Sequence, residues 1–350
     1  MVYNKLLIYW LYFDLNKNKI AILASRNVYN YGLLAQVAKL VDARDLKSLG
    51  RNTVPVRLRP WAPIYHLIDF EMTKIKNNTS KKRIIFSDLD GSFLNEDNFT
   101  YGNNVELVKK LLREDNFIVF NSSKTYIEIK EFLEDINIDL PFICENGGGI
   151  YAPKDIFPKN HRYRDRFCII NESDRIKNNN KFDFEEIKKI FRGKIIFLKD
   201  LSVEEQIKLS GLDKKSLLSA MNREFTEIVI MNSCENVQKD FITYLNIRNL
   251  NISKGGRFHH ISSKFNKGQA MLRLVNEFKK YYSNIEYITI AIGDSNNDLE
   301  MLNAADFSCL IKNRSNSELV KQIDCSNLYI SKNSAPYAWE EYIENYLVKI

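Results

Sequence analysis

Short apolar runs alternate with segments of helical spacing through most of the chain. The run RIIFSDLD at 83–90 ends in acids, which is typical of a buried parallel strand followed by a polar turn. Residues 125–136 have the apolar stripe of an amphipathic helix. Further short apolar runs lie at 117–122, 142–145 and 287–292. Strands that alternate with helices predict an α/β fold with a parallel, doubly wound sheet and right-handed crossovers.

Residues 151–254 break this alternation. They are richer in Lys and Asn, and their pattern mixes helices and strands without a regular order. We therefore predict an α+β cap at 151–254, inserted into a core made of residues 72–150 and 255–350. The elements expected in the cap are helices at 184–191 and 235–245 and strands at 195–198 and 228–231.

The first 71 residues differ from the rest in charge, with ten Lys and Arg against five Asp and Glu. The stretch 36–63 resembles a transfer-RNA gene translated in a protein reading frame, so we expect residues 1–71 to be a non-native leader that precedes a start at Met72. The alternatives are a disordered leader and a basic arm for nucleic acid or an anionic membrane. No aromatic-basic stacking motif supports such an arm, and we expect neither a nucleic-acid nor a membrane partner.

Composition limits the chemistry further. No run approaches the roughly 18 apolar residues needed to span a bilayer. The five cysteines are odd in number and widely spaced, which excludes a disulfide framework and favours a reducing, cytoplasmic location. With four histidines in the chain, a His-rich metal site is excluded. A bound metal would rest on carboxylates, which favours Mg²⁺.

Polar side chains gather where the expected parallel strands end, and ligands of such sheets bind beyond these carboxyl ends. The side chains in question are Asp88 and Asp90, Ser122 with Ser123 and Lys124, Glu145 with Asn146, and Asp294. Acids, hydroxyls and a lysine at one sheet edge indicate a binding site.

Four separated motifs carry the candidate chemistry. A carboxylate such as Asp88 can attack phosphorus, and Asp90 two residues later can donate and accept the proton. The hydroxyls at 122–123 suit phosphate oxygens, and Lys267 can neutralise phosphate and nucleophile. The run GDSNND at 293–298 offers oxygen ligands for Mg²⁺. Alone, the first three motifs could also be an acidic turn, a helix cap and a surface lysine. For the fourth, a plain polar turn does not account for so many oxygen-bearing side chains in one run.

In this order and spacing, the four motifs resemble the haloacid dehalogenase superfamily of phosphohydrolases, and the insertion resembles its C2-type cap. The resemblance implies Asp88 as nucleophile and Asp90 as acid and base, with Ser122 and Lys267 binding phosphate. It also implies a Mg²⁺ site formed by Asp88, the main-chain carbonyl of Asp90 and Asp294, with Asp298 acting from behind.

Three further stretches, at 141–153, 220–227 and 255–260, resemble the mannosyl-3-phosphoglycerate phosphatase family. The resemblance implies hydrolysis of a small phosphorylated glycosyl-glycerate to mannosylglycerate, a compatible solute. The chain departs from the family at Ser92, at Asn266 and at 262–264, where Thr, Asp and glycines are usual. Ser123-Lys124 also replaces the Gly-Arg common in C2 relatives.

Selectivity would depend on groups beyond the phosphate. Arg223 and Arg257 are candidates because a guanidinium pairs with a carboxylate through two parallel bonds. His260 is a further candidate, since only one of two adjacent histidines on a strand can face the site. The pattern leaves open glucosyl-3-phosphoglycerate, sucrose phosphate or another sugar phosphate as substrate, and a phosphosugar mutase as the reaction.

Overall fold

The computed structural model describes residues 11–14, 19–22, 80–157, 161–176, 183–231, 234–254, 258–313, 316 and 318–347. The chain divides into two compact units, Met1–Glu71 and Met72–Ile350. In the first unit, β1 (Leu11–Asp14) and β2 (Lys19–Ile22) pair antiparallel. The rest of the expected leader lies outside the described residues.

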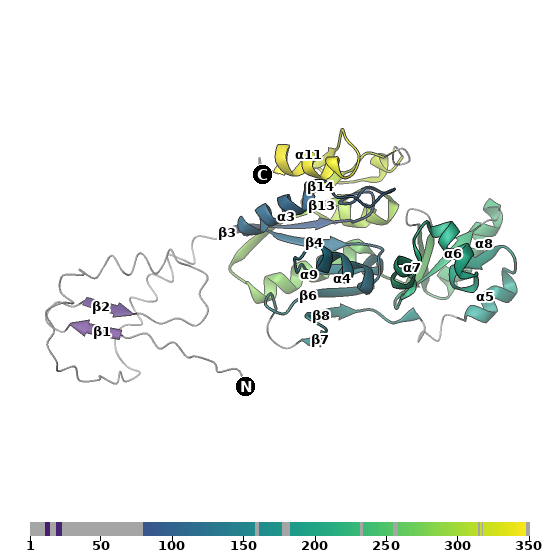
Figure 1. Cartoon of the computed structure of the whole chain (residues 1–350), viewed down its shortest axis with the longest axis horizontal. Helices are drawn as coiled ribbons and strands as arrows, with labels where there is room; N and C mark the ends of the chain where they lie inside the picture. The colour runs from purple at the N-terminus through teal and green to yellow at the C-terminus, as the bar shows by residue number, and fades with distance from the viewer. Residues whose placement is uncertain are drawn as a thin grey trace. The chain divides into compact units, whose positions relative to one another are not determined.

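A nine-stranded sheet forms the centre of the second unit (Figure 1). Its strand order is β15-β14-β13-β3-β4-β5-β6-β8-β7, and the first six of these strands are parallel. The expected α/β fold with a doubly wound parallel sheet is therefore confirmed. The parallel strands are β3 (Ser80–Ser87), β4 (Phe117–Asn121), β5 (Phe142–Cys144), β13 (Ile285–Gly293), β14 (Phe307–Leu310) and β15 (Leu328–Ile330).

Helices cover both faces of the large sheet. Successive strand residues point to opposite sides of a sheet, so neighbouring residues of β3 pack against different helices. Ile85 packs in one hydrophobic cluster with α3 (Asn104–Arg113), α4 (Tyr126–Asp135) and α11 (Tyr337–Asn345). Its neighbours Ile84 and Phe86 pack in a second cluster with α9 and α10. The helices of this second face are α9 (Lys267–Tyr281) and α10 (Leu299–Ala304).

Three antiparallel strands extend the large sheet beyond β5, and the sequence pattern did not predict them. They are β6 (Gly149–Pro153), β7 (Arg162–Arg164) and β8 (Phe167–Glu172). Tyr151 of β6 stacks on Phe142 with ring centroids 5.2 Å apart, so this hairpin completes the core. The expected boundary at 150/151 therefore falls inside a core strand, because the Lys- and Asn-rich composition begins only after β8.

A second, four-stranded sheet with order β11-β12-β10-β9 is antiparallel throughout. Its last strand along the chain, β12 (His259–Ser263), pairs with both β10 and β11, so the expected boundary at 254/255 also differs from the strand pairing. We call residues 173–263 the cap. The other cap strands are β9 (Ile195–Phe197), β10 (Thr226–Met231) and β11 (Leu250–Lys254).

Four helices gather around the small sheet (Figure 1). They are α5 (Phe184–Ile190), α6 (Val203–Ser210), α7 (Lys214–Met221) and α8 (Glu235–Ile247). A separate hydrophobic cluster, which includes Phe197, Val229, Phe241 and Ile261, holds the cap together. The α+β character expected for the insertion is thus observed.

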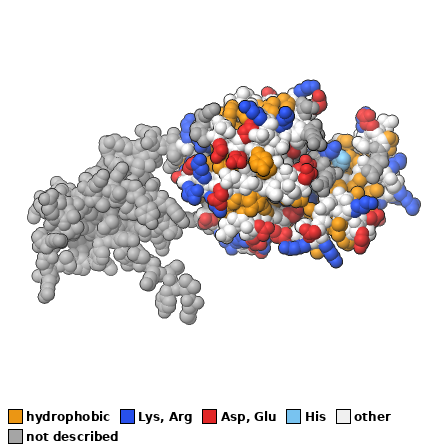
Figure 2. All heavy atoms as spheres, turned by 45° about the horizontal axis from the view of Figure 1, so that its top comes forward, with side chains coloured by type: hydrophobic (Ala, Val, Ile, Leu, Met, Phe, Trp, Pro, Cys, Tyr) orange, Lys and Arg blue, Asp and Glu red, His pale blue; other side chains and the backbone are white. Residues whose placement is uncertain are grey.

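Acidic and basic side chains are mixed over the face of the second unit that Figure 2 shows. Within the part of the chain that the structure describes, helices fall short of the length and apolarity that crossing a bilayer requires.

Candidate active site

The nucleophile candidate lies at the carboxyl end of the central strand. Asp88 follows β3, and its backbone N–H donates a 2.9 Å hydrogen bond to the carbonyl of Ile292 on β13. The Ser87 hydroxyl donates to the Asp88 carbonyl at 2.8 Å, and the Trp339 indole of α11 donates to that hydroxyl at 3.0 Å. Strand pairing and a buried tryptophan together fix the position of Asp88.

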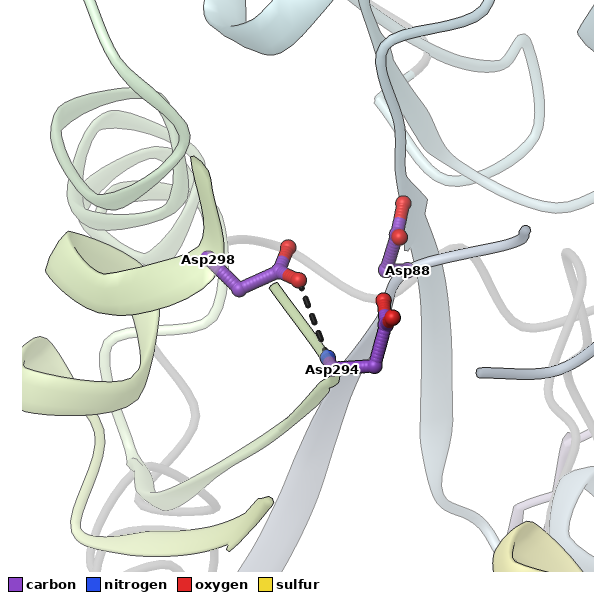
Figure 3. Close-up of side chains that lie close together, drawn as sticks. All are labelled: Asp88, Asp294 and Asp298. Carbon is purple, nitrogen blue, oxygen red and sulfur yellow. Dashed lines mark hydrogen bonds between the residues drawn. The ribbon is translucent and has the colours of Figure 1, made fainter. Parts of the chain in front are cut away.

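Three aspartates converge at this edge, as the sequence predicts. Asp88, Asp294 and Asp298 each present a carboxylate oxygen, and these oxygens lie within 4.8 Å of one another. In Figure 3 the carboxylates of Asp88 and Asp294 lie side by side, and Asp298 reaches toward them from the start of α10. All three side chains are buried, Asp298 completely. Buried carboxylates of like charge are stable in the ionised form only if positive charge lies nearby.

Lys267 supplies part of that charge. Its Nζ, fully buried at the start of α9, lies 2.7 Å from Asp88 Oδ1 and 2.7 Å from Asp298 Oδ1. Burial acts to lower the pKa of Lys267, but Asp298 and Asp88 outweigh it and the net shift is upward. The ammonium is therefore held charged between the two carboxylates.

The carboxylates still carry more negative charge than Lys267 neutralises. Burial raises the pKa of Asp88 to about 7; Lys267 opposes this shift and Asp298 adds to it. Burial, followed by Asp298 and Asp88, raises the pKa of Asp294 well above its usual range. A divalent cation at this place would stabilise the ionised forms of both groups.

The donor set fits Mg²⁺. Asp294 Oδ1 is buried and has no hydrogen-bond partner among the residues that the structure describes. A Cβ added at Gly91, whose φ is +77°, would lie 2.7 Å from Asp294 Oδ2, so glycine leaves the room for this carboxylate. Hard carboxylate oxygens are the ligands that Mg²⁺ prefers.

Asp298 differs from the other two aspartates, because both of its oxygens accept hydrogen bonds. Oδ1 accepts from Lys267, and Oδ2 accepts from the backbone N–H groups of Asp294 and Ser295 at 3.0 and 3.1 Å. Asp298 was predicted among the metal residues. Its geometry suits orientation of Lys267 and of the Asp294 loop.

Asp90, the candidate acid and base, pairs with Lys124. The Lys124 ammonium lies 2.8 Å from Asp90 Oδ2 and 3.8 Å from Glu128. Asp90 Oδ1 is buried without a hydrogen-bond partner among the described residues. Lys124, expected to bind phosphate, therefore lies beside the acid and base group.

A cavity of about 630 Å³ opens beside Lys124 between core and cap. Phe99 and Glu128 line it from the core, and Asp213 and Ser219 line it from the cap. This volume is in the range of small-molecule sites. The cavity therefore provides room for a ligand next to Lys124, and its lining does not include Asp88, Asp90 or Asp294.

The second motif follows β4 at the same sheet edge, because Ser87 pairs in register with Phe120. Ser122 is buried, and its hydroxyl accepts the Lys124 N–H at 3.3 Å. The Ser123 carbonyl accepts a 2.6 Å hydrogen bond from Arg223 of the cap. The predicted phosphate-binding residues thus lie together, in direct contact with the cap.

Glu145 and Asn146 follow β5 and connect core with cap. The Glu145 carboxylate accepts hydrogen bonds from cap residues 224–226, and Asn146 Nδ2 lies 3.5 Å from the hydroxyl of Ser253 on β11. Asn146 Oδ1 accepts from Asn297 at 3.1 Å. Glu145 was predicted to bind substrate, but its oxygens are engaged by the cap.

The three predicted cap residues have different settings. Arg223 is buried and donates to Thr226, to the carbonyl of Ala220 and to the carbonyl of Ser123, so its contacts hold the cap on the core. Arg257 lies outside the described residues. His260 is buried on β12, opposite Ser253.

The imidazole of His260 lies on the sheet face opposite its neighbour Ile261, which belongs to the cap core. Its Nδ1 has no hydrogen-bond partner among the described residues. Burial lowers the pKa of His260 well below its usual range, and Arg223, His259 and Lys267 add to the effect. His260 is therefore a neutral, buried imidazole near the site.

Several asparagines support the site, and sequence reasoning missed two of them, Asn313 and Asn316. Asn313 donates to Asp294 Oδ2 at 2.9 Å, and Asn313 and Asn316 each donate to its carbonyl at 3.0 Å. Asn121 Nδ2 donates to the Lys267 carbonyl at 3.0 Å. Asn313 follows the parallel strand β14, so the strand-end rule that found Asp88 could have found it.

The class of protein follows from a family comparison. Residues 85–332 match the family described as haloacid dehalogenase-like hydrolase, which is more than half of the chain. The chain belongs to this family. The expected superfamily is thereby confirmed.

Named relatives are similar over most of the same region. A Methanococcoides burtonii protein named glucosyl-3-phosphoglycerate/mannosyl-3-phosphoglycerate phosphatase is 30% identical over 279 residues, covering 77% of this chain and 98% of that protein. A Pyrococcus furiosus protein named mannosyl-3-phosphoglycerate phosphatase is 30% identical over 243 residues, covering 65% and 90%. These names agree with the expected class of enzyme, the phosphoric monoester hydrolases.

Solved structures share the fold. A Streptococcus mutans UA159 protein has a TM-score of 0.55 at 23% identity and covers 76% of this chain and 98% of its own. A Bacteroides thetaiotaomicron protein, described among phosphatases of the haloalkanoate (HAD) enzyme superfamily, has a TM-score of 0.53 at 15% identity, with coverages of 75% and 94%. At these identities the likeness supports the fold alone.

Proposed function

We propose that the protein is a Mg²⁺-dependent phosphatase that hydrolyses mannosyl-3-phosphoglycerate to mannosylglycerate and phosphate. The observation that carries the proposal is the buried cluster in which Asp88 contacts Lys267 beside the unpartnered oxygen of Asp294. Phosphoryl transfer of this kind needs a nucleophilic carboxylate, a positively charged side chain held in place, and a carboxylate oxygen that is free to bind a metal ion. The choice of sugar rests on the names of the relatives.

The reaction proceeds in two steps on Asp88. In the first, a carboxylate oxygen of Asp88 attacks phosphorus, the bond to the glycerate oxygen breaks, and Asp90 gives that oxygen its proton. In the second, Asp90 takes a proton from water as the water attacks phosphorus, and the bond to Asp88 breaks. Asp88 and Asp90 end in their starting states, and inorganic phosphate leaves.

The remaining core residues bind and orient. Lys267 stabilises the charge shared by Asp88 and the phosphoryl group, and Asp298 holds Lys267 in place. Ser122, Ser123 and Lys124 line the phosphate side at the end of β4. Asp88 and Asp294 would hold Mg²⁺, which when bound supplies positive charge for the phosphoryl oxygens.

Recognition of the glycosyl-glycerate falls to the cap. His260 presents an unpartnered Nδ1 on the face of the cap sheet that also carries Ser253, which contacts core residue Asn146. We propose that His260 hydrogen-bonds the substrate, and that Arg257 pairs with the glycerate carboxylate. Asn146 lies where it would line the same space.

A phosphate-release panel with the full chain tests the proposal. The substrates are mannosyl-3-phosphoglycerate, glucosyl-3-phosphoglycerate, free 3-phosphoglycerate and sucrose phosphate, each with Mg²⁺. We expect release to be fastest from the glycosyl-phosphoglycerates. Preference for sucrose phosphate would refute the substrate, and an isomerised sugar phosphate without free phosphate would indicate a mutase.

A dual specificity is the second candidate, because the Methanococcoides burtonii relative carries both sugars in its name. The panel separates the two, since equal kcat/KM for the mannosyl and glucosyl substrates would favour it.

A further inference from the structure

Both carboxylate oxygens of Glu145 are engaged by hydrogen bonds at the junction of core and cap. Its side chain is 1% exposed, and its oxygens accept four hydrogen bonds. Oε1 accepts the N–H of Glu224 at 2.9 Å. Oε2 accepts the N–H groups of Phe225 and Thr226 at 3.0 and 2.8 Å and the Thr226 hydroxyl at 2.7 Å. Every one of these donors belongs to the cap.

Arg223 makes the complementary contact in the other direction. Its Nη2 donates to the carbonyl of Ser123 at 2.6 Å, so a cap guanidinium binds the core loop expected to hold phosphate. Its Nε donates to the Thr226 hydroxyl at 2.7 Å and lies 3.9 Å from Glu145 Oε2. Glu145 and Arg223 therefore share Thr226 and interlock the two regions.

The backbone at Glu145 is in an unfavourable conformation. Its φ is +48°, and Asn146 after it has φ +59°, so two consecutive residues with side chains occupy the left-handed region. This geometry directs Glu145 to the cap loop and Asn146 to Ser253. Strain of this kind persists where the surroundings fix it and is common at functional sites.

Close packing leaves the cap loop little freedom in this arrangement. A Cβ added at Gly148 would lie 2.4 Å from Cβ of Phe225, the middle residue of the bound loop. The loop is therefore seated directly on the turn that carries Glu145.

We propose that Glu145 is a positioning residue for the cap, which it holds closed by binding loop 224–226. Closure places Arg223 on the Ser123 carbonyl and His260 near Lys267, so substrates that extend into the cap depend on it. A small phosphoester that occupies the core alone does not. The proposal rests on the proposed phosphatase function for its kinetic consequence and not for its structural one.

The structural consequence is measured by hydrogen exchange of the full chain. Glu145→Gln presents an NH₂ group to donors on one side, so it loses at least one of the four hydrogen bonds. We expect the amides of Glu224, Phe225 and Thr226 to exchange on the order of tenfold faster in this variant. Glu134→Gln, which removes a carboxylate exposed on the core, is the matched control. Unchanged exchange in Glu145→Gln would overturn the proposal, whatever the enzyme acts on.

The kinetic consequence is measured with mannosyl-3-phosphoglycerate and p-nitrophenyl phosphate. We expect Glu145→Gln to lower kcat/KM by about 10- to 100-fold for the first and by less than about threefold for the second. Equal losses on both substrates would show that Glu145 supports the fold or the phosphate site instead. If the wild type releases phosphate from neither, the proposed function fails while the exchange result stands.

Thr226→Ala keeps the assay decisive if the Glu145 variant folds poorly. It removes one donor to Glu145 and the acceptor of Arg223 Nε, and it leaves the three backbone N–H groups that bind Glu145. We therefore expect a smaller loss with the same substrate dependence. In the double variant with Glu145→Gln, the two losses should be less than additive, because both act on one contact. Strict additivity would contradict the interlock.

Discussion

Two buried carboxylates at the same sheet edge, Asp88 and Glu145, have opposite surroundings. Asp88 faces the charged side chains of Lys267, Asp294 and Asp298. Glu145 faces uncharged cap donors, three of them backbone N–H groups, with Arg223 at 3.9 Å. The surroundings of Asp88 bring several charges together, whereas those of Glu145 satisfy its carboxylate oxygens with hydrogen bonds.

The difference teaches how one fold separates reactivity from position. Burial raises the pKa of Asp88 to about 7, and the like charge of Asp298 adds to this shift, so the cluster depends on Lys267 and an added cation. Backbone donors satisfy the oxygens of Glu145 and fix where the cap lies, without supplying reactive groups. We therefore expect changes in the cluster to affect every substrate, and changes at the cap contact to affect large substrates most.

The largest effect is expected from Asp88→Asn, which keeps the shape of the side chain but cannot attack phosphorus. Phosphate release should fall at least about 1000-fold for all substrates, with the circular dichroism spectrum unchanged. Substantial turnover by this variant would show that Asp88 is not the nucleophile, and the functional contrast between Asp88 and Glu145 would then fail.

Removal of the metal ligand should follow. Asp294→Ala takes away the unpartnered carboxylate and should reduce phosphate release at least about 100-fold at millimolar Mg²⁺. Chelator should inactivate the wild type in the same assay. Asp324→Ala, an exposed aspartate, is the control, and full activity of the wild type in excess chelator would exclude the metal site.

Lys267→Met tests the charge balance through stability. The change leaves Asp88 and Asp298 buried without their cation, and loss of one partner of a buried ion pair costs about 3–5 kcal/mol. We expect a lower free energy of unfolding by denaturant titration, beside a loss of activity. Lys279→Met, on the exposed face of the same helix, should change stability little. Equal stability of both variants would mean that the cluster is not charged as described.

Arg223→Ala should have the smallest effect and the sharpest substrate dependence. Losing a buried charge-assisted hydrogen bond to Ser123 costs about 1.5–3 kcal/mol, roughly one to two decades in kcat/KM for the glycosyl-phosphoglycerate. Turnover of p-nitrophenyl phosphate should change far less. Arg192→Ala, which removes an exposed arginine of the cap, is the control. Equal losses on both substrates would show that Arg223 acts on the common catalytic step, and the distinction between the aspartate cluster and the cap contact would then not hold.

Local pattern was sufficient for the parallel strands and the catalytic edge. The apolar run before Asp88 and the oxygen-rich run at 293–298 each report a strand end, and parallel strands bring their ends to one edge. Asp88 and Asp294 were therefore predicted together, although they lie far apart along the chain. Lys267 lies at the start of a helix, and only the resemblance of the four motifs to a known superfamily added it to the site.

Only the tertiary structure decided the antiparallel edge, the cap sheet and the role of Glu145. Whether residues 149–172 join the core or the cap depends on strand pairing, which a short apolar run does not specify. Three of the four donors to Glu145 are backbone N–H groups, which every residue except proline carries. The residue types at 224–226 therefore give no indication of these hydrogen bonds. The sequence determined which side chains could react, and long-range pairing determined which backbone groups hold them.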